Sequence, residues 1–221
     1  MKKILFITIA TCFIVTGCSC SNEPDIDDNT IAQSSTSTSD ITEANGTETE
    51  TETSTLLPEG MAYQLEDGSY IEIDQLLAPM NSLNSICQGL SNSDSWLSVY
   101  PVGVTEKLAE YNEFESIEEY ADFLHTAYVQ MYGENYTLSN EYKSCSLLDE
   151  EQLSDMSEFY SDHFYVDILP EYAFIVESQF CVTYTDEEGE EQQDCTSDYY
   201  IAYYLDGSMY LDYFYVDSID L

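Results

Sequence analysis

The chain has 221 residues, with 44 Asp and Glu against four Lys and Arg, which gives a formal net charge of −40 at pH 7. So acidic a protein repels nucleic-acid phosphates and anionic lipid head groups, because these cannot release counterions onto it. We therefore expect no nucleic-acid binding. The partners left open are a cationic protein, a divalent cation or a neutral ligand such as a glycan.

The first seventeen residues have the pattern of a secretory signal peptide. Lys2 and Lys3 precede an apolar run from Ile4 to Val15, which is shorter than the roughly 20 residues needed to span a bilayer. The run ends in Val-Thr-Gly-Cys, residues 15–18, which resembles a bacterial lipobox. The resemblance implies cleavage of residues 1–17, attachment of a diacylglyceryl group to Cys18 as the new N-terminus (palmitate is one such acyl chain) and anchoring in the membrane on its extracytoplasmic face.

Residues 18–57 are predicted to form a disordered tether. They are rich in Ser, Thr and acids and contain few apolar residues, so they cannot bury enough surface to offset the entropy of ordering. A flexible chain of this length has a mean reach of roughly 35 Å. After cleavage, only Lys107 and Lys143 remain against all 44 acids, a formal charge of −42.

From Pro58 the composition becomes aromatic and aliphatic, which predicts a single folded domain over 58–221. Its first element is a hairpin over 62–73 that turns on Asp67-Gly68. A first helix has apolar residues at helical spacing from Met80 to Leu90, and a short turn around Trp96 follows, stopped by Pro101.

A second helix is predicted to begin at a capping box over 116–119 and to end at Gly133. Residues 135–148 are predicted to be extended, and Asp149 caps a third helix. After Pro170 the apolar period changes from 3.6 to 2, so strands follow, with turns at 186–191 and at Asp206-Gly207. We expect an α+β fold with helices on one face of an antiparallel sheet.

The order of these elements, ending in "YYLDGSMYLDYF", resembles the nuclear-transport-factor-2-like superfamily, the cystatin-like cone of many small Gram-positive lipoproteins. The resemblance spans about 76–217 and implies a strongly bent sheet wrapped around helices. Met209-Tyr210 stands where those proteins often have Trp-Tyr. The superfamily includes ketosteroid-isomerase-like enzymes, but no residue here matches their motif, and the fold implies no single activity.

Four cysteines lie in the folded part, and they allow three fully paired connectivities. Cys181 and Cys195 are equidistant from Glu188 in a predicted hairpin, so we predict a cross-strand disulfide between them, with two free thiols as the alternative. Cys87 lies on an apolar helix face, as a buried thiol would. The fourth cysteine of the folded part is Cys145.

No pattern predicts a cofactor or a structural metal. The domain has no Cys-x-x-Cys and no Cys/His zinc spacing. The acidic turn at 186–191 lacks the ligand spacing of an EF-hand calcium loop, so we expect a solvated hairpin tip. Neither His125 nor His163 accompanies a nucleophile motif, and no catalytic residue is assigned.

Seven tyrosines lie within 198–217. With a two-residue turn at Asp206-Gly207, alternate residues face opposite sides of the last hairpin, so one side is predicted to be core and the other a flat aromatic platform. The candidate binding face carries either Tyr200, Tyr204 and Tyr213 or, on the other side, Tyr199, Tyr203 and Tyr210.

These features favour a lipid-anchored bacterial surface protein with a non-enzymatic domain that binds a ligand or partner. Two alternatives stay open. One is a small isomerase- or hydrolase-like enzyme with its active site in the cone cavity. The other is a structural accessory of a membrane complex.

Overall fold

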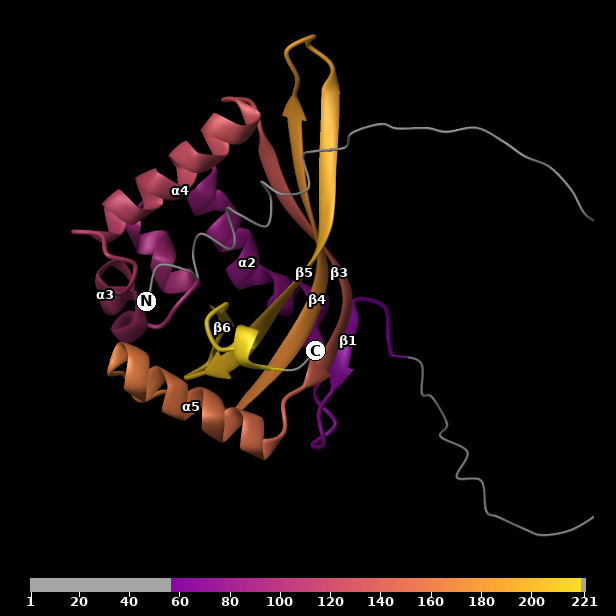
Figure 1. Cartoon of the computed structure of the whole chain (residues 1–221). Helices are drawn as coiled ribbons and strands as arrows, with labels where there is room; N and C mark the ends of the chain where they lie inside the picture. Colours follow the sequence, from indigo (N-terminus) through magenta and orange to yellow (C-terminus); the bar gives the residue numbers. More distant parts are fainter. Residues whose placement is uncertain (1–56, 220–221) are drawn as a thin grey trace, which may run out of the picture.

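Four α-helices and a four-stranded antiparallel sheet make up most of residues 57–219, the part of the chain that the computed structural model describes (Figure 1). The predicted signal peptide at 1–17, the lipidation site at Cys18 and the tether at 18–57 lie outside the described residues, apart from Leu57. None of the helices described is long and apolar enough to cross a membrane.

The predicted first hairpin is confirmed. Strand β1 (Met61–Gln64) pairs antiparallel with β2 (Tyr70–Glu72). The turn between them contains Gly68 at φ +86°, a conformation that suits glycine, and the Asp67 carboxylate accepts a hydrogen bond of 2.9 Å from the Ser69 backbone N–H.

The three predicted helices are also present. They are α2 (Ile73–Cys87), α4 (Ile117–Tyr132) and α5 (Glu150–Phe164). The Ser116 hydroxyl caps α4 by accepting from the Glu119 N–H at 3.1 Å, and Asp149 forms a full capping box with Gln152 on α5. Helix α2 ends before Leu90, which is 76% exposed, so the apolar spacing overran the helix by one turn.

One helix was not predicted. Helix α3 (Val102–Tyr111) begins directly after Pro101, which the sequence analysis treated only as a stop. Proline ends a preceding helix but can also stand directly before the next one: Pro101 is the N-cap of α3, and its carbonyl accepts from the Thr105 N–H at 2.9 Å. Here Pro101 does both, since the 3₁₀ helix η1 (Ser93–Ser98) precedes it.

The sheet has the strand order β3-β4-β5-β6, with β3 (Thr137–Leu147), β4 (Tyr172–Thr185), β5 (Glu191–Leu205) and β6 (Ser208–Asp212). Its last hairpin has the predicted pairs Tyr204–Met209 and Tyr203–Tyr210. The fold is α+β, and the described sheet lacks the strong curl that a cone requires.

Helix α2 lies against one face of the sheet, with α4 on its outer side, and all four helices are on the left of the long strands in Figure 1. The expectation that the helices share one face is wrong at the β6 end, where α2 contacts Tyr200 and α5 contacts Tyr203 on the opposite face of β5. The main core joins α2, α3, α5 and the ends of β4 to β6. A second cluster lies under α4, where the rings of Tyr128 and Tyr136 stack at 5.6 Å beside Phe180 and Val182. A short 3₁₀ helix, η2 (Val216–Ser218), follows the last strand and contacts β5.

Candidate ligand-binding groove

The predicted tyrosine platform is wrong for Tyr200 and Tyr203, which are both 0% exposed. This half of β5 is covered on both faces. On one side the Tyr200 hydroxyl donates to the Leu76 carbonyl of α2 at 3.2 Å. On the other, the Tyr203 ring lies 6.2 Å from that of Tyr160 in α5. Strand alternation therefore places both tyrosines in core, not one in core and one in solvent.

Tyr213 is half-buried, and its hydroxyl is bound within the domain. It lies beyond the end of β6, so it does not pair with Tyr200 in the ladder, although their rings are 6.0 Å apart. Its hydroxyl donates a hydrogen bond to the Asp198 carboxylate and lies 3.5 Å from the Met80 sulfur. Burial raises the pKa of Asp198, and the hydrogen bond from Tyr213 opposes that rise.

The other three tyrosines reach the surface at different places. Tyr199 is 39% exposed. Tyr204 is half-buried and stacks on Tyr172 with ring centroids 4.8 Å apart and planes 3° apart. Tyr204 and the half-buried Tyr210 line a surface groove that the sequence analysis did not identify.

This groove consists of two adjoining open hollows, of about 480 and 420 Å³, which share Ser82 and Ser98. Helix α2 and η1 form its walls along the whole length. One hollow ends at the turn between β5 and β6, and the other at the loop that follows α2. The lining residues are Gln75, Ala78, Ser82, Ser85, Leu90, Ser91, Asn92, Ser95, Leu97, Ser98, Tyr204, Gly207, Ser208, Met209 and Tyr210.

Local sequence explains how these side chains meet. Gln75, Ala78, Ser82 and Ser85 are spaced three or four residues apart, so they form one stripe on α2. The tight turn at Asp206-Gly207, with φ of +51° and +85°, brings the start of β6 back beside that stripe. The Leu211 N–H donates to the Val99 carbonyl at 2.9 Å and so fixes η1 next to β6.

The groove carries no charge. None of its fifteen lining residues is Asp, Glu, Lys, Arg or His, although 22% of the chain is charged. Ser, Asn and Gln supply hydrogen-bond donors and acceptors, and Tyr204 supplies an aromatic ring. Such a surface suits a neutral ligand with many hydroxyl or amide groups.

Comparison of the chain with protein-family models, curated proteins and solved structures gives no match. Its function is therefore inferred from the geometry and chemistry of its own residues.

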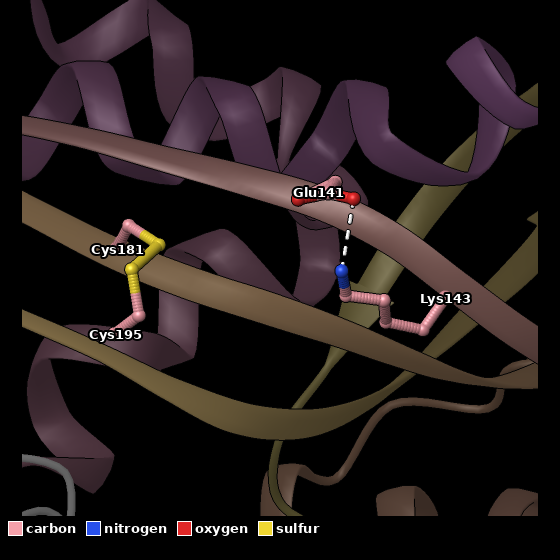
Figure 2. Close-up of polar contacts among 4 residues, drawn as sticks. All are labelled: Glu141, Lys143, Cys181 and Cys195. Carbon is pink, nitrogen blue, oxygen red and sulfur yellow. Dashed lines mark hydrogen bonds and ion pairs between the residues drawn. A yellow bond between two sulfur atoms is a disulfide. The ribbon is translucent and has the colours of Figure 1, made fainter.

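The structure contains the disulfide between Cys181 and Cys195, with an S–S distance of 2.03 Å. The two residues are directly paired in the β4–β5 ladder. Cys195 and Tyr200 differ by an odd number of positions in one strand, so the bridge lies on the face away from α2. Figure 2 shows the bridge with the helices behind the strands, near the exposed Lys143–Glu141 ion pair of 2.8 Å.

The other two described cysteines are free thiols. Cys87 is buried, as its apolar helix face predicted, and burial raises its pKa to about 12. Cys145 is half-buried, with its sulfur 3.7 Å from the Ala62 carbonyl oxygen, and burial raises its pKa too. Neither thiol has the depressed pKa that a nucleophilic cysteine needs.

Both histidines have local structural contacts. His125 Nδ1 lies 3.0 Å from the Cys87 carbonyl oxygen and 2.9 Å from the Tyr136 hydroxyl, so it helps to hold the end of α2 against β3. His163 Nδ1 donates to the Phe159 carbonyl at 2.9 Å, and its ring stacks on Phe159 at 4.2 Å. Neither residue lines the groove.

The most perturbed described carboxylate is Asp212, which is fully buried. Its oxygens accept hydrogen bonds from the Tyr160 hydroxyl at 2.7 Å and from the backbone N–H groups of residues 214–216 at 3.0–3.2 Å. Burial raises its pKa to about 6, although the hydrogen bonds oppose the rise. Asp212 was not predicted as a site residue, and its one signal in the sequence is an acid inside the aromatic run "YLDYFYV".

Within the described part of the chain, no three His, Cys, Asp or Glu residues are grouped so that they could hold a metal ion. In the acidic turn at 186–191, the Asp186 carboxylate instead accepts from the N–H groups of Glu188 and Glu190, at 3.0 and 2.9 Å, and from the Gln192 side chain at 2.7 Å. These bonds lower the pKa of Asp186 and close the hairpin tip.

Proposed function

We propose that this chain is a lipid-anchored extracytoplasmic protein whose folded domain binds a neutral, hydroxyl-rich ligand of the glycan class without transforming it. The observation that carries the proposal is the uncharged groove between α2, η1 and the β5–β6 turn on an otherwise very acidic chain.

The chemistry of the lining favours a glycan over the other partners that the charge allows. A cationic protein or a divalent cation gains most from carboxylates, and the groove has none. Sugar hydroxyls both donate and accept hydrogen bonds, as the serine hydroxyls and the amides of Asn92 and Gln75 do. The ring of Tyr204, held in place by Tyr172, can pack against the apolar face of a sugar.

Binding is favoured over catalysis because the residues that line the groove include no carboxylate, histidine, lysine or cysteine. Asp212 combines a raised pKa with a tyrosine partner, as a catalytic acid would, but it is 0% exposed and fully hydrogen-bonded. His125 is engaged by the end of α2. A small enzyme and a structural accessory of a membrane complex are the competing functions. An altered glycan would indicate the enzyme, and binding of no glycan would favour the accessory.

The lipobox-like residues 15–18 support the anchor, and the Cys181–Cys195 disulfide supports an oxidising, extracytoplasmic location. We also propose a distant relation to the nuclear-transport-factor-2-like superfamily. It rests on the element order over 76–217 alone, and it requires a sheet less curved than the family's cone.

The test measures binding of the full chain to an array of neutral and acidic glycans, with Ser82→Lys and Asn81→Lys as a matched pair. Both substitutions add the same charge to adjacent residues of α2, but Ser82 lines both hollows and Asn81 lines neither. We expect neutral glycans to be retained and their affinity to fall at least about tenfold in the Ser82 variant, because a long cation displaces hydroxyl contacts. The Asn81 variant should bind as the wild type does.

Equal affinity in both variants would contradict the assignment of the groove as the binding site. Retention of acidic glycans alone would contradict the proposal that the ligand is neutral. Mass spectrometry of the recovered glycan separates binding from catalysis, since an altered glycan would indicate the enzyme. Incorporation of labelled palmitate in cells, compared between the wild type and Cys18→Ala, tests the anchor.

A further inference from the structure

Strand β5 is much longer than its partner β6, and this leaves part of the sheet edge open. Residues Glu191–Leu205 form β5, but β6 pairs only with residues 201–205. All seven residues from Glu191 to Ser197 are exposed. In Figure 1 this part of β5 runs with β4 toward the hairpin tip, away from β6.

The register shows which backbone groups face outward. Cys181 and Cys195 are opposite each other with Cα atoms 4.2 Å apart, the spacing of a pair that does not exchange backbone hydrogen bonds. The N–H and C=O of Cys195 therefore point away from β4. Because β4 and β5 pair without a register shift, the same holds for Glu191, Gln193 and Ser197.

Two further observations support this assignment. By the same alternation, the backbone groups of Tyr203 and Leu205 should point away from β4. Both residues do pair with β6 on that side. Outside the β4 ladder, residues 191–197 form no backbone–backbone hydrogen bond with any part of residues 57–219. The outward groups thus form a row of backbone donors and acceptors over seven residues, in which the Ser197 carbonyl accepts one long hydrogen bond of 3.4 Å from the Thr196 hydroxyl.

The opposite edge of the sheet has protection that this edge lacks. On β3 the register shifts between Tyr142 and Ser144, Lys143 lies within that irregularity, and β1 lies alongside with the Ala62 carbonyl near Cys145. Bulges, lysines and covering elements are the usual means of blocking strand addition. The free part of β5 is regular and contains no Lys, Pro or Gly.

The negative charge around the free part of β5 determines which kind of strand can pair with it. Residues 186–198 contain seven acids and no base. A second copy of this edge would place like charges side by side, and the chain's own residues 18–56 carry nine acids and no base. A basic extended segment would instead gain both backbone hydrogen bonds and charge complementarity.

We propose that the free edge of β5, residues 191–197, is a docking edge for a basic, extended segment of a partner protein, which adds to the sheet as a fifth strand. The Cys181–Cys195 disulfide holds this edge in register against β4 before the partner arrives, so less ordering entropy is lost on binding. The groove plays no part in this surface, so the two proposals can fail separately.

The probe is a seven-residue peptide of alternating Lys and Val or Thr, compared with the same peptide N-methylated at alternate residues along one edge. Methylation leaves charge and side chains unchanged but blocks strand pairing. We expect the full chain to bind the first peptide at low salt and the methylated peptide at least about tenfold more weakly. On binding, the amides of Gln193, Cys195 and Ser197 should become protected from hydrogen exchange.

Gln193→Pro and Gln193→Ala form the matched variants. Proline removes an outward N–H and should weaken binding at least about tenfold, whereas alanine changes only a side chain and should have little effect. Equal binding of both peptides, or no binding of either, would overturn the proposal even if the proline variant misfolds. Protection of the same amides in the chain without peptide would also overturn it, by assigning the edge to a second copy or to this chain's own residues.

Discussion

The hydroxyl of Tyr160 donates a hydrogen bond of 2.7 Å to Oδ1 of Asp212, and this contact ties helix α5 to the end of the sheet. The same carboxylate accepts from the backbone N–H groups of Phe214, Tyr215 and Val216, so it also folds the chain after β6 into η2. One buried acid therefore organises the junction of three elements.

Asp212→Ala should destabilise the domain by on the order of 3 kcal/mol, because it leaves a buried hydroxyl and three backbone donors without their acceptor. Urea unfolding measures this as a lower midpoint with an unchanged slope. Asp217→Ala, which removes the same charge from an exposed residue of η2, should shift the midpoint little. A similar loss in both variants would show that charge, and not the hydrogen-bond cluster, controls stability.

The stability of the domain should fall as pH rises from about 4 to about 6. The pKa of Asp212 is about 6 in the folded state against 3.8 ordinarily, so the folded state binds more protons than the unfolded state between these values. Ionising the buried carboxyl then costs on the order of 3 kcal/mol above pH 6. Asp212→Asn should lack this component, and the difference between the two unfolding curves at pH 4.5 and pH 7 isolates it. If the stability difference between the wild type and Asp212→Asn is the same at pH 4.5 and pH 7, the pH dependence does not come from Asp212.

Loss of the Cys181–Cys195 disulfide should lower the free energy of unfolding by up to about 3 kcal/mol, as expected for closing a loop of this length. The double variant Cys181→Ser with Cys195→Ser tests this, with Cys145→Ser as the control that keeps the bridge. Hydrogen exchange should increase mainly over residues 186–198, since β6 and the core hold the rest of β5. A uniform increase across the sheet would mean that the bridge stabilises the whole domain.

The two free thiols should differ in their reaction with iodoacetamide at pH 8. Cys87 is buried and its pKa is raised to about 12, so it should stay unmodified until the chain unfolds. Cys145 is half-buried and should react slowly in the native state. Peptide mapping by mass spectrometry separates them from the cysteines near the N-terminus. Rapid labelling of Cys87 would show that the α2–α4 contact opens readily.

Local sequence signals were reliable wherever neighbouring residues decide the structure. The caps at Ser116 and Asp149, the turns at Asp67-Gly68 and Asp206-Gly207, and the register of the last hairpin were all predicted, because each depends on residues only a few positions apart. Helix α3 was missed because Pro101 signals both an end and a beginning. The disulfide was predictable because hairpin symmetry about residue 188 brings its cysteines together.

The amino-acid sequence by itself determined the α+β class, the extreme acidity and the pairing within the last two hairpins, since these depend on composition and on short-range geometry. Only the tertiary structure decided which surfaces are free. Strand alternation cannot reveal that α2 covers one face of β5 while α5 and the last residues cover the other, so Tyr200 and Tyr203 became core. Nor can it show that Ser82, Ser98 and Tyr204, far apart along the chain, meet in one uncharged groove.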